Sequence, residues 1–389
     1  MKKILIFSTA YLPMIGGAEI AVKEITDRLG DDFSFNLICA RIKKELPAQE
    51  KIGRIDVYRL GCGCFFDKYY LALAGHYFAS QLHKQNSYNA IWAIMASYGG
   101  FAAMFFKKKN PSVPFLLTLQ EGDPLDHIKK RVGIFAGWFA QIFTRSDYIQ
   151  AISRFLAGWA KEMGAKCPIE VVPNGVNPGK FSIFPLRHGF VEASNFQFSN
   201  KEFKEKLGIK ENEKVIITAS RLVGKNGIGD LIGSLTYLSV NFRLLILGSG
   251  PLEKGLKSQV LNSKLQDRVL FFGKYENDDL PKYLAISDVF VRPSLSEGQG
   301  ISFLEAMAAG VPIIGTNVGG IPDFLKDNET GLFCEVANPK SIAEKIEALL
   351  NNEDLRQRLI VNGKKLVEEK YDWLAIAQRM REIINRLIA

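Results

Sequence analysis

Residues 289–316 read VFVRPSLSEGQGISFLEAMAAGVPIIGT. The apolar run VFVRPS predicts a buried strand, the glycine-broken SEGQG predicts a loop, and ISFLEAMAAG predicts a short helix. That helix is expected to end at Gly310, because glycine is a common helix stop and Pro312 prevents continuation. A second strand, VPIIGT, follows. Strands that are apolar almost throughout and are joined by helices are typical of a parallel sheet with helices on both faces.

The same alternation of strands and helices runs along the whole chain. Further strands are expected at KKILIFST, FNLICA, IDVYRL, AIWAIM, PFLLTLQ, YIQAI, IEVVP, VIITAS, FRLLILG, VLFFG and GLFCEV. Helices are expected at residues 18–30, 68–85, 99–109, 127–143, 153–163, 227–238, 341–352 and 354–389, the last interrupted near Tyr371. The predicted fold class is therefore α/β, with doubly wound parallel sheets.

Two domains are expected, because 389 residues exceed the size at which one hydrophobic core usually stops growing. Periodicity lapses over residues 173–200, where Pro, Gly, Asn and Ser accumulate, so we place the linker there. The N-terminal domain is predicted to span 1–175 and the C-terminal domain 176–372. A final helix, 373–389, is expected to pack back on the first domain.

Composition is that of an ordinary folded enzyme, with 47% hydrophobic and 23% charged residues. The opening MKKILIFSTAYLP predicts a buried strand rather than a signal peptide, since its apolar stretch is short and no small-residue cleavage site follows. The longest other apolar run, residues 132–143, is well short of the ~20 residues that span a bilayer. Five scattered cysteines do not suggest a disulfide framework, which favours a cytoplasmic protein.

Cys62 and Cys64, with His76 and His83 downstream, offer possible ligands for a zinc site. Structural zinc usually has roughly two to four residues between paired cysteines, and here only Gly63 separates them. Small buried thiols in a glycine-rich turn are the favoured interpretation.

The net charge is +9, and the excess of basic residues lies in the first half of the chain. Residues 107–109 (KKK) and 129–131 (KKR) adjoin the apolar stretches FAAMFF and VGIFAGWFAQIF. Basic and aromatic residues together suit an anionic membrane surface, which predicts a cytoplasmic protein that is peripheral on the inner face of the cell membrane. Solvated lysines beside ordinary core helices are the alternative. Nucleic acid is not expected, because no stacking motif or zinc finger accompanies the charge.

Ligands of doubly wound sheets bind beyond the carboxyl ends of the strands, so the loops there are the candidate sites. Gly16 and Gly17, after the first strand, allow backbone amides to approach a phosphate, with a plain tight turn as the alternative. They are not part of a full G-x-G-x-x-G, which disfavours a dehydrogenase. Arg221 and Lys225 follow the strand VIITAS and are placed to clamp a diphosphate.

Carboxylates mark two further loops. Glu297 lies in the loop 296–300, and Glu305 lies in an apolar helix, where a carboxylate needs donors such as sugar or ribose hydroxyls. The alternatives are a solvated Glu305 and a Glu297 that caps the helix. Glu121 and Asp123 follow the strand PFLLTLQ and are expected to bind substrate hydroxyls. A divalent metal there is disfavoured, because no third ligand is evident.

Several of these stretches resemble segments of the retaining glycosyltransferases of family 4, whose GT-B fold has two facing Rossmann-like domains and an interdomain cleft. The resemblance covers nearly the whole chain and is densest over residues 215–336. The segments are SRLVGKNG, LGSGPLE, VLFFGKY, SEGQGISFLEAMAAGVPIIGTNVGGIPDFL, NETGLF, GGAE and VPNGVNPGKF. In the long segment, seven residues separate Glu297 from Glu305.

The resemblance implies a role for each candidate. Arg221 and Lys225 would hold the donor diphosphate, and Glu297 would lie over the donor sugar, so these three form the catalytic set. Glu305 would accept hydrogen bonds from ribose hydroxyls. The other donor-binding residues would be Gly16, Gly17, Gly248, Gly250, Lys274, Tyr275, Gly300 and Ile301. Transfer would proceed with retention, by a front-face route that requires neither a metal nor a cofactor besides the nucleotide-sugar donor.

One position departs from the family's pattern. Many members carry a histidine after the strand matching LLTL, where it contacts the donor sugar, whereas this chain has Gln120. Glutamine hydrogen-bonds a sugar hydroxyl but carries no charge. Gln120, Glu121 and Asp123 are assigned to the sugar and acceptor side of the cleft.

The predicted function is transfer of a sugar from a UDP- or GDP-sugar to a glycan, lipid-linked or small-molecule acceptor. A nucleotide-sugar epimerase of the same fold would bind the same donors and is the alternative. A non-catalytic nucleotide-sugar or membrane-binding protein is a third hypothesis. A glycosidase also uses paired carboxylates, but it does not explain the Arg221 and Lys225 pair.

Overall fold

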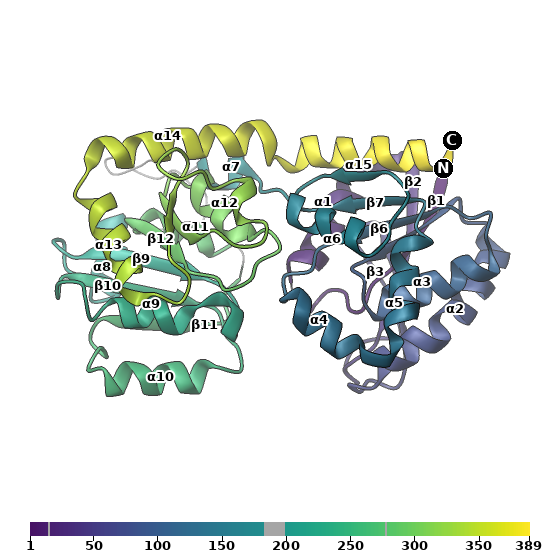
Figure 1. The fold of residues 1–389 in the computed structure, drawn as a ribbon, viewed down its shortest axis with the longest axis horizontal. Coiled ribbons are helices and arrows are strands. Elements are labelled where there is room, and N and C mark those ends of the chain that lie inside the picture. Colours follow the sequence, from purple (N-terminus) through teal and green to yellow (C-terminus); the bar gives the residue numbers. More distant parts are fainter. Residues whose placement is uncertain (15, 183–198, 277) are drawn as a thin grey trace. The chain divides into compact units, whose positions relative to one another are not determined.

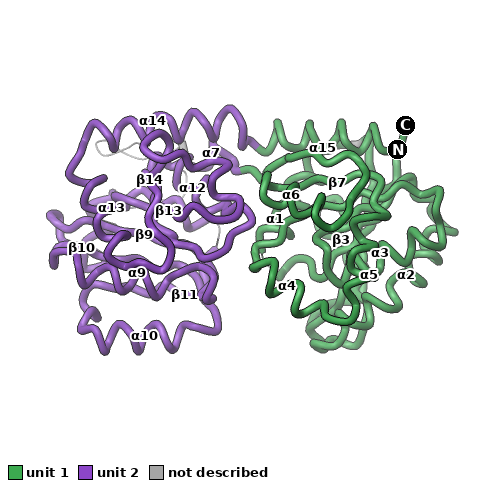
Figure 2. Tube along the Cα trace, in the orientation of Figure 1, with its two compact units in different colours: residues 1–175, 373–389 green, residues 176–372 purple. Residues whose placement is uncertain are grey.

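The computed structural model describes residues 1–389 except 15, 183–198 and 277. The chain forms two compact units, residues 1–175 together with 373–389, and residues 176–372 (Figure 2). Each unit is an α/β domain built on a largely parallel sheet, which confirms the predicted fold class. Residues 183–198 of the predicted linker lie outside the described residues.

The first unit contains an eight-stranded sheet in the order β3-β4-β2-β1-β5-β6-β7-β8. The strands are β1 (Lys2–Phe7), β2 (Phe33–Ala40), β3 (Gln49–Ile52), β4 (Ile55–Leu60), β5 (Ala90–Ile94), β6 (Phe115–Leu119), β7 (Tyr148–Ala151) and β8 (Ile169–Val171). Neighbouring strands are parallel except β3 and β4, which pair antiparallel. The sequence pattern does not predict β3, because three of its four residues, QEKI, are polar and the strand lies at the sheet edge.

Helices cover both faces of this sheet (Figure 1). They are α1 (Gly17–Arg28), α2 (Asp67–Asn86), α3 (Tyr98–Lys109), α4 (Leu125–Val132), α5 (Ala136–Thr144), α6 (Arg154–Glu162) and α15 (Trp373–Ile388). The single helix predicted over 127–143 is wrong. It is divided into α4 and α5 by a 3-10 turn that begins at Gly133, whose φ of +52° interrupts an α-helix.

Alternate residues of β1 explain why the unit has two cores. Leu5 and Phe7 lie in the cluster with α2, α3 and α5, whereas Ile4 and Ile6 lie in the cluster with α1 and α15. Successive side chains of a strand point to opposite faces, so an apolar run serves both cores. The second cluster includes Ile376, Ile383 and other residues of α15, so this helix packs within the first unit.

The second unit contains a six-stranded sheet in the order β11-β10-β9-β12-β13-β14, with every pair of neighbours parallel. Its strands are β9 (Lys214–Ala219), β10 (Phe242–Leu247), β11 (Val269–Gly273), β12 (Val289–Arg292), β13 (Ile313–Thr316) and β14 (Leu332–Cys334). Its helices are α7 (Pro178–Ser182), α8 (Asn200–Lys206), α9 (Ile228–Ser234), α10 (Glu253–Asn262), α11 (Leu280–Ala285), α12 (Ile301–Ala308), α13 (Pro339–Leu350) and α14 (Glu353–Lys370). The loops after β9, β10, β11 and β12 leave one edge of the sheet and carry most of the predicted donor residues.

Among the helices in the described part of the chain, none combines the length and the apolar character needed to cross a bilayer.

Candidate active site

The loops after β9 and β10 lie against each other through their backbones. Leu222 N donates to Ser249 O at 3.0 Å, and Leu252 N donates to Leu222 O at 3.1 Å. A Cβ added to Gly248, where φ is +130°, would lie 1.8 Å from Ser220 O, and one on Gly250 would lie 2.5 Å from Leu222 O. Gly248 and Gly250 therefore allow the loop after β10 to pack directly against the backbone of residues 220–222, beside Arg221.

The loop that carries Arg221 and Lys225 also contacts the loop after β12. Leu295 N donates to Lys225 O at 2.6 Å. Gly227 has φ +66°, and a Cβ there would lie 2.0 Å from Pro293 O, so only glycine fits. Arg221 is exposed and Lys225 is half-buried. The chain thus holds both cations at the edge of the sheet where the Glu297 loop begins.

Glu297 is held by Arg292, a residue outside the candidates predicted from the sequence. Arg292 ends β12 and is buried, and its guanidinium donates to Ser302 Oγ at 2.8 Å and forms an ion pair with Glu297 Oε2. The guanidinium also lies 4.9 Å from the centroid of the Phe303 ring. Gly298 N donates to Glu297 Oε1 at 3.1 Å. Glu297 is therefore fixed by a buried cation, and it does not act as a side-chain cap of α12.

Two glycines leave room for this arrangement. Gly300 precedes α12 with φ +91°, and a Cβ there would lie 2.6 Å from Arg292 Nη2. Gly319 has φ +55°, and a Cβ there would lie 1.9 Å from Glu297 O. Gly320 N donates to that same oxygen at 3.0 Å. The loop around Glu297 is thus tied to the segment after β13, and Gly300 and Ile301 form the start of α12 beside it.

Glu305 lies in the middle of α12 in an environment that disfavours its charge. Burial raises the pKa of Glu305 to about 7, while the cations of Lys180 and Arg292 act in the opposite direction. Burial, reinforced by the nearby Glu305, also raises the pKa of Tyr275 above its usual range. Glu305 and the predicted base-binding Tyr275 are therefore neighbours, and a freely solvated Glu305 does not fit the structure.

Lys180 is one of the two cations that act on Glu305, and Lys274 precedes Tyr275 in the chain. Lys180, in α7, forms an ion pair with Asp278 at 2.7 Å. Lys274 follows β11 and is exposed. In the sequence, Lys180 stands out only as part of the segment VPNGVNPGKF, and Arg292 only as part of the predicted strand VFVRPS. A lone arginine in an otherwise apolar strand was the available signal for Arg292, because a buried guanidinium requires a partner.

In the first unit, Glu121 is anchored at the carboxyl end of β6. Glu121 Oε1 accepts from Ala96 N at 2.6 Å, while Oε2 is buried and has no hydrogen-bond partner among the described residues. Burial raises the pKa of Glu121 to about 7, against the lowering effect of backbone amides, and Asp123 adds to the rise. Gln120 Oε1 accepts from Asn174 Nδ2 at 3.1 Å. Gln120, Glu121 and Asp123 therefore lie in one loop at the carboxyl end of β6.

Gly16 and Gly17 form the start of α1 in the same unit. Gly16 has an extended backbone, and a Cβ there would lie 2.6 Å from Glu19 Oε2. Ile20 N donates to Gly16 O at 3.2 Å, so the first helical turn is formed. Their contact with the donor diphosphate stays a prediction.

Comparison with known families gives this geometry its context. Residues 199–366 match the family model described as Glycosyl transferases group 1, and residues 15–180 match the model described as Glycosyltransferase Family 4. The chain is a family 4 glycosyltransferase. The resemblance inferred from the sequence motifs is thereby confirmed.

Curated relatives of this glycosyltransferase resemble it over matched regions of 193 to 384 residues, three of which are described here. An uncharacterized glycosyltransferase of Methanocaldococcus jannaschii is 33% identical over 220 residues, which are 56% of this chain and 53% of the relative. N-acetyl-alpha-D-glucosaminyl L-malate synthase of Bacillus anthracis is 31% identical over 229 residues, 58% of this chain and 56% of the relative. A GDP-mannose-dependent alpha-(1-6)-phosphatidylinositol monomannoside mannosyltransferase of Mycobacterium tuberculosis is 28% identical over 251 residues, 62% of each chain. The matched regions therefore span little more than half the length of these relatives.

Solved structures share the fold of this glycosyltransferase over its whole length. Sucrose-phosphate synthase from Thermosynechococcus elongatus has a TM-score of 0.85 at 20% identity and covers 100% of this chain and 99% of its own. Anabaena HepE, solved with UDP and glucose, has a TM-score of 0.78 at 17% identity and covers 99% of this chain and 100% of its own. At these identities the likeness establishes the GT-B class of fold.

Proposed function

We propose that this glycosyltransferase is a retaining hexosyltransferase that moves a sugar from a UDP- or GDP-sugar to a glycan, lipid-linked or small-molecule acceptor. The observation that carries the proposal is the grouping at one sheet edge of Arg221, Lys225, and the ion pair of Arg292 with Glu297. Nucleotide binding is supported by the relatives, since one mannosyltransferase depends on GDP-mannose and HepE was solved with UDP.

In the proposed mechanism, Arg221 and Lys225 stabilise the negative charge that develops on the departing diphosphate. Cations placed in advance at such a position lower the barrier without reorganisation during the reaction. The leaving phosphate accepts the proton of the acceptor hydroxyl, and the new bond forms on the same face of the sugar. This route uses no metal and no cofactor besides the donor.

Glu297 faces the positive charge that develops on the donor sugar, and Arg292 keeps its carboxylate in place. Glu305 accepts hydrogen bonds from the ribose hydroxyls. Such donors favour the ionised carboxylate and offset the burial that raises the pKa of Glu305 in the free protein. Gln120, Glu121 and Asp123 supply polar groups on the sugar and acceptor side.

The first unit carries surface features that suit a lipid-linked acceptor. Exposed aromatic and aliphatic residues lie within α2 and α5 and just before them. They are Phe65, Phe66, Tyr69, Tyr70, Leu73, Tyr77, Ile134, Phe135 and Trp138. Cations lie among them, with Lys68 Nζ 3.3 Å from the centroid of Phe65 and Lys109 Nζ 3.8 Å from that of Tyr77. Aromatic rings with lysines beside them fit an anionic membrane surface.

Part of the sequence expectation for this surface is wrong. In FAAMFF, Ala102, Ala103, Met104 and Phe106 are buried, because α3 packs between the sheet and α2. Lys107 forms an ion pair with Asp147 and does not extend from the surface. The membrane proposal therefore rests on α2, α4 and α5, and it places the protein at the cytoplasmic face of the cell membrane.

A nucleotide-sugar assay tests the proposed function. The protein is incubated with UDP- and GDP-sugars, with and without a mixture of glycan and lipid-linked acceptors, and nucleoside diphosphate is measured. Release that depends on acceptor supports transfer, whereas a changed sugar nucleotide without acceptor favours an epimerase. Binding without either reaction favours a non-catalytic protein. Sedimentation with anionic vesicles at low salt tests the proposed membrane-binding surface. If the protein does not sediment with the vesicles, the membrane proposal is contradicted and the proposed transferase activity is not.

A further inference from the structure

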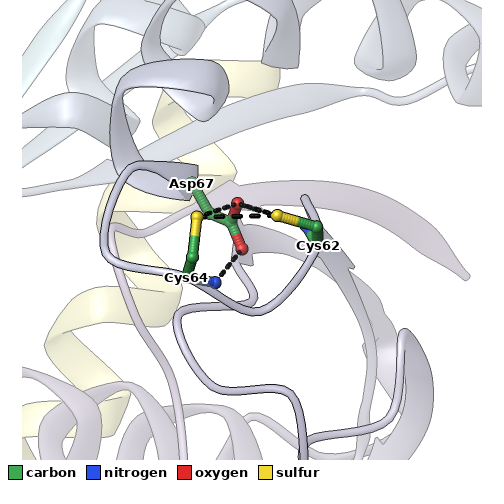
Figure 3. Close-up of side chains that lie close together, drawn as sticks. All are labelled: Cys62, Cys64 and Asp67. Atoms are coloured by element: carbon green, nitrogen blue, oxygen red, sulfur yellow. Dashed lines mark hydrogen bonds between the residues drawn. The ribbon is translucent and has the colours of Figure 1, made fainter.

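The turn between β4 and α2 brings together two thiols and a carboxylate, none of which is among the residues assigned to the donor. Cys62 Sγ lies 3.5 Å from Cys64 Sγ. Asp67 Oδ1 lies 3.6 Å from Cys62 Sγ and 3.4 Å from Cys64 Sγ. Figure 3 shows the three groups facing one another. Cys62 is exposed and Cys64 is half-buried, so the expectation of buried thiols is wrong for Cys62.

The turn is shaped around Asp67, which is the first residue of α2 and is buried. Its Oδ1 accepts from Cys62 N at 3.1 Å, and its Oδ2 accepts from Gly63 N at 2.7 Å and Cys64 N at 3.0 Å. Gly61 has φ +109°, and a Cβ there would lie 2.1 Å from Asp67 Cγ. The backbone thus holds the carboxylate fixed against the two cysteines.

A second glycine fixes the outer part of the turn. Gly63 has φ +89°, and a Cβ there would lie 2.5 Å from Lys44 Cα and 2.9 Å from Lys43 C. The turn is therefore seated on the backbone that follows β2. Both cysteines are held by elements outside their own short segment, as expected of ligands whose positions are set before an ion arrives.

The three distances match one face of a coordination tetrahedron. With metal–sulfur bonds of about 2.3 Å and a metal–oxygen bond of about 2.0 Å, tetrahedral angles separate two sulfurs by about 3.8 Å and a sulfur from an oxygen by about 3.5 Å. The observed edges are 3.5, 3.6 and 3.4 Å. We propose that Cys62, Cys64 and Asp67 bind a zinc ion.

The charges and the accessibility of the site agree with this choice. Two thiolates and a carboxylate suit a borderline-soft cation such as Zn²⁺, whereas Mg²⁺ and Ca²⁺ prefer oxygen ligands. Because Cys62 is exposed, solvent reaches the fourth coordination position. Asp67 Oδ2 is held by amides and cannot easily turn away. The ion would tie the start of α2 to the preceding turn.

The histidines of the earlier zinc hypothesis do not take part. His83 Nδ1 accepts from Tyr88 N at 3.1 Å. His76 is buried, and its ring centroid lies 5.6 Å from that of Phe105. Among the described residues, only Cys62, Cys64 and Asp67 form a group of at least three possible ligand side chains.

Zinc titration of the full chain tests the proposal. The protein is stripped with a chelator, kept reduced with a phosphine, and titrated with Zn²⁺ against a competing chromophoric chelator. We expect one ion per chain, and at least about 100-fold weaker binding in Cys62→Ser and in Cys64→Ser. Cys167→Ser, which changes a half-buried thiol elsewhere, should bind as the unchanged protein does. Co²⁺ in place of Zn²⁺ should show thiolate charge-transfer absorption that is weaker in both variants.

Asp67→Asn serves as a second variant, with about 10–100-fold weaker binding expected. Zn²⁺ should also raise the thermal midpoint of the unchanged protein but not that of Cys62→Ser, since an ion that binds only the folded state stabilises it. The proposal is overturned if the reduced protein does not bind Zn²⁺, if both cysteine variants bind it as tightly as the unchanged protein, or if the cobalt spectrum shows no thiolate ligand.

Discussion

Methionine in place of Arg292 would leave Glu297 without the cation that holds it. The side chains of Arg292 and Glu297 retain only 7% and 14% of their exposure. Removing one member of a buried ion pair costs about 3–5 kcal/mol, and we expect about 3 kcal/mol because Glu297 keeps some contact with water. For a unit of this size, that corresponds to a fall of about 6–12 °C in the thermal midpoint.

Activity should fall more than the lost stability explains. A catalytic group displaced by about 1 Å can lose roughly 100-fold in rate, so we expect kcat of Arg292→Met to fall by about that factor under conditions in which the protein stays folded. The assay is acceptor-dependent release of nucleoside diphosphate, with the folded fraction measured by circular dichroism. Adding Glu297→Gln to Arg292→Met removes the unpaired charge, so the double variant should be more stable than Arg292→Met alone.

Arg243→Met is the matched control. Arg243 lies near the amino end of β10, at the edge of the sheet away from the site, and its Nη2 lies 2.7 Å from Glu213 Oε1 with side-chain exposures of 17% and 7%. Arg243→Met should lose about as much stability as Arg292→Met and should keep the kcat of the unchanged protein. Equal kcat values for the two methionine variants would refute a positioning role for Arg292, and so would activity losses of Arg292→Met and Glu297→Gln that simply multiply.

Three further substitutions test separate parts of the site. Glu305→Gln should weaken binding of the nucleotide donor about 10-fold or more by calorimetry, because a hydrogen bond to a charged group is lost; undiminished affinity would exclude the ribose contact. Glu121→Gln should raise the thermal midpoint at pH 8 and leave it nearly unchanged at pH 4. The folded pKa of Glu121, about 7, lies above the unfolded value, so its contribution to stability is lost as the pH rises through that interval, and a midpoint that rises equally at both pH values would contradict this. Gly248→Ala should lower both stability and donor affinity, because its Cβ would lie 1.8 Å from Ser220 O. The control is Gly255→Ala in α10, where a Cβ has nothing within 4 Å, and it should stabilise the protein by about 0.5–1 kcal/mol. Equal effects of the two substitutions would show that the close approach of the loops is unimportant.

The sequence predicted the features that depend on local pattern. Continuous apolar runs identified the parallel strands. Gly248 and Gly250 lie where a second backbone approaches closely, and Gly300 lies where the side chains of Arg292 and Phe303 do. The polar edge strand β3 has no such pattern, because its formation depends on pairing with β4. The break between α4 and α5 depends on the conformation of a single residue, Gly133, within an apolar run that reads as one helix.

The contacts that orient the candidate site were beyond sequence reasoning. The partner of Glu121 is a backbone amide at Ala96, in a loop after a different strand. The neighbours of Glu305 include Tyr275 and Lys180, which come from distant segments that only the fold brings together. Arg292 lies five residues before Glu297, yet a strand and a turn must form before their side chains meet. Residue type and position in the chain therefore indicated the candidates, while their partners required the structure.

The packing of α15 has a consequence for the order in which the protein folds during synthesis. Trp373, Ile376, Met380 and Ile383 complete the core that Ile4 and Ile6 begin, so the part of this sheet face that α15 covers stays open until residues 373–383 have been synthesised. The second unit is a continuous segment, 176–372, and all of its strands are available earlier. Although domains usually fold in the order of synthesis, here the unit that is made second is the first able to bury its core completely.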